Sequence, residues 1–296
     1  MNMKLKTLIT IAFLFLLGKV NAQLTVVTSF KEAQTISISK NKPIFLIIKD
    51  FKKFSEYKYV NNPEVKKVLK NFVVLELQDQ NSSDYRYLKS LKQSRYGLGG
   101  NVLDPLGNVI GIGHIGQLRG TSYTSKTELN LVKEDLIRNS FDLSLLKEDY
   151  KAILKNKNIN ARINLIEKYL NYSLNTSFYR NKKQKNSPLF SDVAGRYSKE
   201  FKKEIKRNNT LIKSDQQRLE LLFLYKIVVD EKYNRAAKKL QKMHAEAIYE
   251  SNKSLFYYLS YIANHKANNN LVAKEWFSKL KSQKDFDNYN FLSKKV

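Results

Sequence analysis

Residues 42–48 read Lys-Pro-Ile-Phe-Leu-Ile-Ile, and this stretch decides the fold class of the first half of the 296-residue chain. A continuous apolar run with β-branched residues and a proline at its start predicts a strand buried in the centre of a sheet. The segments before and after this strand indicate which elements surround it.

Helix signals lie on both sides of the predicted strand. Ser29 and Glu32 form a capping box at the start of a helix over residues 30–39. Asn62 is a suitable N-cap, and Pro63 stands at the first helical position, where its missing N–H leaves no hydrogen bond unmade. The sequence therefore predicts one helix before the strand and one after it.

Two further elements complete the first half. A second strand is expected over residues 72–77, followed by a helix that begins at Ser83. Residues 102–110 predict a β-hairpin, because their Asp-Pro-Leu-Gly turn places Gly107 where the backbone needs a positive φ. The predicted order is helix, strand, helix, strand, helix and hairpin.

This order resembles the thioredoxin superfamily, especially the exported thioredoxin-like proteins of the bacterial cell envelope. The resemblance rests on residues 39–44 (Ser-Lys-Asn-Lys-Pro-Ile), 62–73 (Asn-Pro-Glu-Val leading to Asn-Phe-Val) and 103–108 (Leu-Asp-Pro-Leu-Gly-Asn). It implies an α/β thioredoxin-like domain within residues 23–124, with the fold itself over about 24–120, followed by an all-α domain. Some other small α/β domain is the alternative.

Two departures from the superfamily pattern concern its redox site. Members carry a redox-active cysteine pair directly after the first central strand and a cis-proline before the hairpin. Here the chain has no cysteine at all, residues 49–59 follow the strand, and residues 95–101 contain no proline. Because thiol–disulfide exchange requires a thiolate, the resemblance implies a redox-inactive domain, and no catalytic residue is carried over.

The segment that replaces the redox site alternates aromatic and basic residues. Aromatic side chains are frequent interface anchors, and long cations steer acidic partners. The alternative is that Phe51 and Phe54 fill the core while the lysines are merely solvated. The candidate partner-binding residues are Phe51, Lys52, Lys53, Phe54, Tyr57, Tyr59, Leu98, Gly99 and Gly100.

Residues 1–22 have the pattern of a secretory signal peptide. Lys4 and Lys6 precede an apolar run over residues 8–17, which is shorter than the about 20 residues of a membrane span. Val20 and Ala22 then form a small-residue cleavage site. The expected mature chain begins at Gln23 and is exported to the periplasm or the extracellular space, with no later membrane span.

The chain has a formal net charge of +26, and most of that charge lies in the second half. Residues 126–296 carry 35 basic and 19 acidic residues, against 15 and 8 in residues 23–125. Such a charge attracts polyanions. For an exported protein we expect anionic lipid, lipopolysaccharide, acidic glycan or acidic protein rather than nucleic acid. A solvated basic surface without a specific ligand is the alternative.

Residues 125–296 change to helical periodicity and predict a basic α-helical domain. A polar, basic loop is expected over residues 174–188. Beyond it, one helix carries a basic face that suits an anionic surface, although a solvated face is the alternative. The candidate polyanion-binding residues are Lys199, Lys202, Lys203, Lys206 and Arg207.

A faint internal repeat occurs in this domain, because Tyr225, Ala237 and Leu240 precede Tyr261, Ala273 and Trp276 by 36 residues each. The spacing is weakly similar to helix pairs of the tetratricopeptide type, whose period is about 34 residues. An ordinary helical bundle is the alternative. One apolar stripe is interpreted as core, and it consists of Leu222, Phe223, Tyr225, Lys226 and Val229.

Catalytic motifs are not found in the sequence. His114, His244 and His265 lack the spacing of a metal site, so neither a metal nor a cofactor is expected. The glycines between residues 97 and 120 are interpreted as turn and bulge positions rather than a phosphate loop. The leading hypothesis is non-enzymatic binding of another envelope protein, as an adaptor or chaperone-like component. Polyanion binding is the alternative, and a hydrolase with a carboxylate pair is the third.

Overall fold

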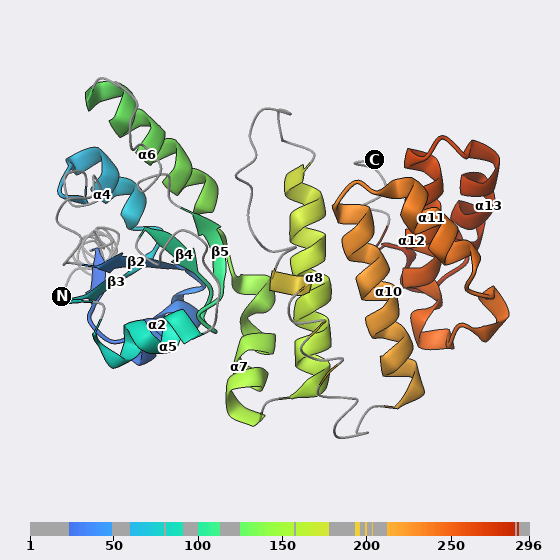
Figure 1. The fold of residues 1–296 in the computed structure, drawn as a ribbon, viewed down its shortest axis with the longest axis horizontal. Helices are drawn as coiled ribbons and strands as arrows, with labels where there is room; N and C mark the ends of the chain where they lie inside the picture. The colour runs from blue at the N-terminus through green and yellow to red at the C-terminus, as the bar shows by residue number, and fades with distance from the viewer. Residues whose placement is uncertain are drawn as a thin grey trace, which may run out of the picture.

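The computed structural model of the chain describes residues 24–48, 60–79, 81–90, 100–112, 125–156, 158–177, 193–195, 199, 203, 212–287 and 289. A mixed sheet with helices occupies one end of the elongated molecule, and a stack of helices occupies the other (Figure 1). The coarse prediction of an α/β unit followed by a helical region is therefore confirmed.

The sheet has five strands in the order β1-β3-β2-β4-β5. β1, β3 and β2 run parallel, β4 pairs antiparallel with β2, and β5 pairs antiparallel with β4 to form a hairpin. The predicted central strand is confirmed, since β2 pairs with β3 on one side and β4 on the other. The three-residue edge strand β1 was not predicted. The strands are β1 (Thr25–Val27), β2 (Ile44–Ile48), β3 (Val73–Leu77), β4 (Asn101–Leu103) and β5 (Val109–Ile112).

Helices cover both faces of the sheet (Figure 1). Alternate residues of β2 enter two separate apolar clusters, because successive side chains of a strand point to opposite faces. Ile44, Leu46 and Ile48 pack with residues of α2 and α5, whereas Phe45 and Ile47 pack with residues of α4 and α6. The helices are α2 (Phe30–Lys40), α4 (Pro63–Leu69), α5 (Ser83–Ser90) and α6 (Ser125–Asn139).

The helix starts differ in how they are capped. The side chain of Asn62 accepts a hydrogen bond of 2.9 Å from the Glu64 N–H, as predicted for α4. At α2 the predicted capping box is wrong, because the Ser29 side chain makes no capping hydrogen bond. Instead the Phe30 N–H donates to Asp84 Oδ2 of α5 at 2.7 Å. A tertiary contact thus satisfies one of the free N–H groups at the helix start, a different donor from those of the predicted capping box.

The hairpin turn is organised by the carboxylate of Asp104. Its Oδ1 accepts hydrogen bonds of 2.8 Å from the N–H groups of Leu106 and Asn108. Gly107 has φ 82°, so the predicted need for glycine at this position is confirmed. A bulge then shifts the register, since Leu103 pairs with Val109 and Val102 with Gly111.

The second half is built from helices, as predicted. α8 continues to Ser177, so the predicted loop over 174–188 is wrong for its first four residues, and residues 178–188 lie outside the described part of the chain. The helices are α7 (Lys147–Asn156), α8 (Ile159–Ser177), α10 (Lys213–Val229), α11 (Tyr233–Gln241), α12 (Lys253–Lys266) and α13 (Asn270–Lys281), with 3-10 turns η3 (Ser144–Leu146), η4 (Ala245–Ala247) and η5 (Glu250–Asn252).

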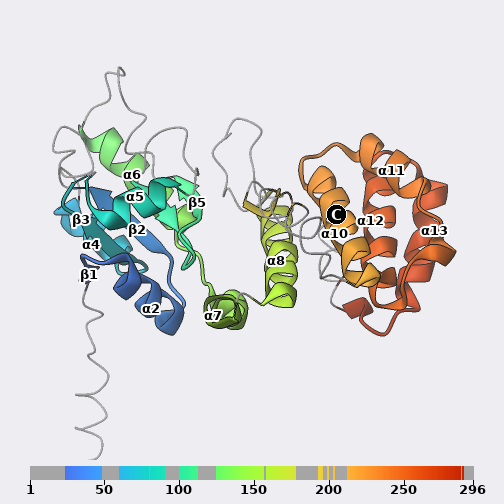
Figure 2. The ribbon, with the colours of Figure 1, turned by 60° about the horizontal axis from the view of Figure 1, so that its bottom comes forward.

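The internal repeat corresponds to two successive helix pairs. Tyr225 and Tyr261 lie near the ends of α10 and α12, while Ala237 and Ala273 are buried in α11 and α13. α12 packs against α10, α11 and α13, and Figure 2 shows these four helices side by side. The 36-residue offset therefore reflects the succession of two helical hairpins.

The sheet unit and the helical region share one apolar cluster. It runs from the α4/α6 face of the sheet through α7 and α8 to α12. α6, which the predicted boundary placed in the helical domain, packs on α4 and β5 of the sheet unit. Between the two parts, the Leu143 N–H donates to the Asn41 carbonyl at 3.0 Å.

None of the helices in the described residues is both long and apolar enough to cross a membrane. The predicted signal peptide over residues 1–22 lies outside those residues.

Candidate anion-binding pocket

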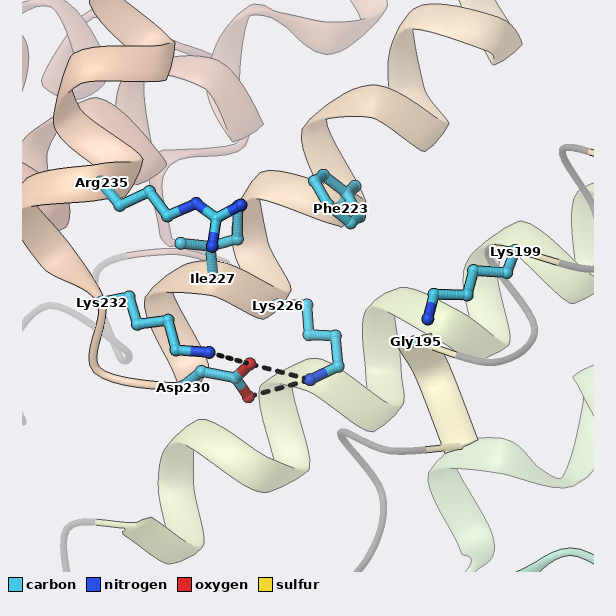
Figure 3. A pocket seen from close by; sticks show the side chains of 8 residues that line it. All are labelled: Gly195, Lys199, Phe223, Lys226, Ile227, Asp230, Lys232 and Arg235. Atoms are coloured by element: carbon cyan, nitrogen blue, oxygen red, sulfur yellow. Dashed lines mark hydrogen bonds and ion pairs between the residues drawn. The ribbon is translucent and has the colours of Figure 1, made fainter.

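A pocket of about 430 Å³ opens between α10, α11 and a short helical segment that precedes them (Figure 3). Four of its eight lining residues are basic, and one is acidic. The pocket is lined by Gly195, Lys199, Phe223, Lys226, Ile227, Asp230, Lys232 and Arg235.

The turn between α10 and α11 brings the charged side chains together. Glu231 adopts φ 60°, and the Lys232 N–H donates to the Ile227 carbonyl at 3.1 Å. Lys226 Nζ lies 2.9 Å from both carboxylate oxygens of Asp230, and Lys232 Nζ lies 3.7 Å from Oδ2. One carboxylate therefore orients two of the four cations, as Figure 3 shows.

The opposite wall depends on Gly195. A Cβ atom at this position would lie 2.4 Å from Cε and 2.7 Å from Cδ of Lys226. Only a residue without a side chain therefore lets the aliphatic part of Lys226 pass along the segment in its present path. Gly195 and its neighbours Val193 and Ala194 are buried, so this wall is part of the packed core.

The remaining two cations are available to a ligand. Within the described part of the chain, neither Lys199 nor Arg235 forms an ion pair, and they reach the pocket from different walls (Figure 3). With only Asp230 to offset four cations, the pocket carries an excess of positive charge. A concave site with low-dielectric walls concentrates such a field and attracts anions.

A second pocket of about 350 Å³ lies further along the same two helices. Phe223 is a wall of both pockets, and Lys239 Nζ lies 5.9 Å from the centre of its ring. The second pocket is lined by Glu220, Phe223, Leu224, Lys239, Lys242 and Met243.

The sequence located only part of this site. Of the predicted polyanion-binding residues, Lys199 lines the pocket and Lys203 is exposed elsewhere, whereas Lys202, Lys206 and Arg207 lie outside the described residues. The interpretation of the α10 stripe as core is confirmed for Leu222 and Tyr225, which are buried, and Phe223 and Val229 are partly buried and pack against the same core. It is wrong for Lys226, which lines the pocket, and Phe223 lines the pocket as well.

Sequence reasoning also missed the basic residues of α11. Lys232, Arg235, Lys239 and Lys242 are spaced by three, four and three residues, which places them on one face of a helix. This spacing was a signal that the sequence itself contained.

The predicted partner-binding set lies almost entirely outside the described residues; Gly100 is its one described member. Gly100 is buried with φ 73°, and its N–H donates to the Leu46 carbonyl at 2.9 Å. Residue 100 therefore enters β4 beside the end of β2. The members that lie outside the described residues are Phe51, Lys52, Lys53, Phe54, Tyr57, Tyr59, Leu98 and Gly99.

Other polar clusters in the described residues serve packing. Arg218 of α10 donates to Glu167 of α8 in a largely buried ion pair, and Tyr225 donates to Asn171 at 2.6 Å. The same residues contain no group of three or more His, Cys, Asp or Glu side chains placed to hold a metal ion.

Comparison with protein-family models gives no match, and comparisons with curated proteins and with solved structures give none either.

Proposed function

We propose that this chain is an exported binding protein that holds an anionic ligand in the basic pocket between α10 and α11. The observation that carries the proposal is the surplus of cations around that pocket. Lys199 and Arg235 have no ion-pair partner among the described residues, and one carboxylate faces four basic side chains. Multidentate contact with Arg and Lys is a common means of binding carboxylates, sulfates and phosphates.

For the first half, we infer a redox-inactive thioredoxin-like scaffold. The strand order β1-β3-β2-β4-β5, with helices on both faces, supports this assignment. The chain has no cysteine to supply a thiolate. We also infer that residues 1–22 direct export, which rests on their charge and hydropathy pattern.

A second candidate function is adaptor-like binding of an envelope protein at one edge of this scaffold. The alternation of aromatic and basic residues over 49–59 supports Phe54 and Tyr57 as candidate anchors. Leu98 and Gly99 directly precede Gly100 in the sequence, and the N–H of Gly100 donates to the Leu46 carbonyl of β2. Such binding should survive moderate salt and be lost in the double variant Phe54→Ala, Tyr57→Ala.

Calorimetric titration tests the pocket. The chain from Gln23 onward is titrated with inorganic pyrophosphate at several salt concentrations. The two proteins compared are wild type and the double variant that combines Lys199→Gln with Arg235→Gln. We expect the double variant to lose about tenfold in affinity and to depend less steeply on salt. The matched control is Lys274→Gln, Lys284→Gln, which removes the same charge from exposed positions outside both pockets. An equal loss in both double variants would show that net charge alone attracts the anion, and the proposal would be wrong.

A further inference from the structure

The two pockets are aligned along one pair of antiparallel helices. The turn end of α10 and the start of α11 form the first pocket, through Asp230, Lys232 and Arg235. Earlier residues of α10 and later residues of α11 form the second pocket, through Glu220 and Lys242. Phe223 lines both, so the pockets adjoin at its ring.

A continuous row of cations follows this line. The basic residues at 232, 235, 239 and 242 lie on one face of α11 and its C-terminal turn. Lys232 and Lys242 flank α11, and the ten steps from residue 232 to residue 242 extend about 15 Å at about 1.5 Å per residue. The hollow therefore presents positive charge along a length that exceeds a single small anion.

The lining is not purely cationic. Phe223, Ile227 and Met243 supply apolar surface, and Asp230 and Glu220 place one carboxylate in each pocket. A ligand that consisted only of anionic groups would bind the cations but would offer these carboxylates no hydrogen-bond donor. A ligand that combines anionic groups with hydroxyl donors and a flat apolar face matches all three kinds of surface.

We propose that the two pockets form one groove for an extended acidic oligosaccharide, with uronate or sulfate groups on the basic row of α11 and one sugar ring against Phe223. This inference rests on the proposed function and specifies its ligand. Sugar hydroxyls donate to Asp230 and Glu220, and the C–H face of the ring packs on the aromatic ring. Volumes of about 430 and 350 Å³ are of the size that encloses compact ligand groups.

An acidic peptide is the closest competitor, and the lining disfavours it. The carboxylates of such a peptide sit on flexible side chains, whose ordering costs conformational entropy. A sugar ring presents a rigid face to Phe223 and fixed hydroxyls to the two carboxylates. The groove therefore selects the more rigid polyanion.

The test is a calorimetric titration with oligogalacturonates of increasing length, from the monomer to the hexamer. The proteins compared are wild type, the double variant that combines Lys239→Gln with Lys242→Gln, and the single variant Phe223→Ala. We expect affinity to rise with length until both pockets are filled. The Lys239→Gln, Lys242→Gln variant should lose about tenfold for the hexamer and little for the monomer or for pyrophosphate. Phe223→Ala should weaken hexamer binding more than pyrophosphate binding, because only the oligosaccharide has a ring that packs on Phe223.

Two outcomes would overturn this inference and leave the proposed function intact. One is pyrophosphate binding that depends on Lys199 and Arg235, together with equal affinity for the monomer and the hexamer. The other is a hexaglutamate peptide that binds at least as tightly as the oligogalacturonate and is insensitive to Phe223→Ala. If neither pyrophosphate nor any oligosaccharide binds, the proposed function itself fails.

Discussion

The phenolic hydroxyl of Tyr169 in α8 donates a hydrogen bond to the carboxylate of Asp104 in the β4–β5 turn. The two residues are 65 positions apart, and both are fully buried. Tyr150 of α7 extends the contact, since its hydroxyl lies 3.0 Å from that of Tyr169. The helical region is thereby attached to the same carboxylate that organises the hairpin turn of the sheet unit.

The first prediction concerns the pH dependence of this attachment. Burial raises the pKa of Asp104 to about 6, while hydrogen bonds from Tyr169, Asn108 and Leu106 keep it from rising further. A carboxyl whose pKa is raised on folding favours the folded state below its unfolded pKa of about 4, and that advantage is lost as the pH rises through about 6.

We therefore compare the free energies of unfolding of Asp104→Asn and wild type. The value for the variant minus the value for wild type should increase between pH 4 and pH 7. A shift of about two pKa units corresponds to at most about 3 kcal/mol. Urea unfolding of both proteins at each pH measures it. A constant difference between the two proteins across this range would contradict the prediction.

The second prediction removes the donor rather than the acceptor. Tyr169→Phe leaves a buried carboxylate without one of its hydrogen bonds, which should lower the free energy of unfolding by about 1–3 kcal/mol at pH 7. Denaturant unfolding followed by far-ultraviolet circular dichroism gives the value. Tyr249→Phe is the control, because Tyr249 is exposed and should change stability by less than about 0.5 kcal/mol. An equal loss of stability in Tyr169→Phe and Tyr249→Phe would contradict the prediction.

The third prediction concerns the packing of α6 on the sheet. A Cβ atom on Gly111 of β5 would lie 2.2 Å from Oδ1 of Asn139, the last residue of α6. Gly111→Ala should therefore cost about 1–3 kcal/mol, as overpacked buried sites do. Adding Asn139→Ala removes the collision, so the double variant should be less destabilised than the sum of the two single variants. Strict additivity in thermal unfolding would show that Asn139 is not the obstacle.

The fourth prediction is a substitution in the pocket that strengthens anion binding instead of weakening it. Asp230→Asn removes the carboxylate that engages Lys226 and Lys232 and should strengthen pyrophosphate binding by about threefold to tenfold. Calorimetry at low salt measures the change. Glu246→Gln removes an acidic charge at an exposed position outside both pockets and serves as the control. Weaker binding by Asp230→Asn would mean that the carboxylate positions the lysines for the ligand instead of competing with it.

Local sequence signals predicted the elements that depend on local chemistry. The apolar run at 44–48 became the central strand, Asn62 capped α4, and Gly107 took the positive φ of the hairpin turn. The edge strand β1 was missed because three residues contain too little pattern, and its pairing with β3 comes from a partner about fifty residues away. The predicted capping box of α2 was wrong, and the hydrogen bond found at the start of that helix, from the Phe30 N–H to Asp84 of α5, joins residues 54 positions apart.

The candidate site depends even more than the fold on contacts between residues that are distant in sequence. The sequence by itself determined that the chain has no thiolate and carries a large positive charge, and it indicated a faint 36-residue repeat. Only the tertiary structure decided which cations share a hollow. Lys199 reaches the pocket from a segment separated from α10 in sequence, and Gly195 leaves room for Lys226. Helical periodicity specifies which residues share one face of one helix, but which faces meet depends on packing between segments distant in sequence.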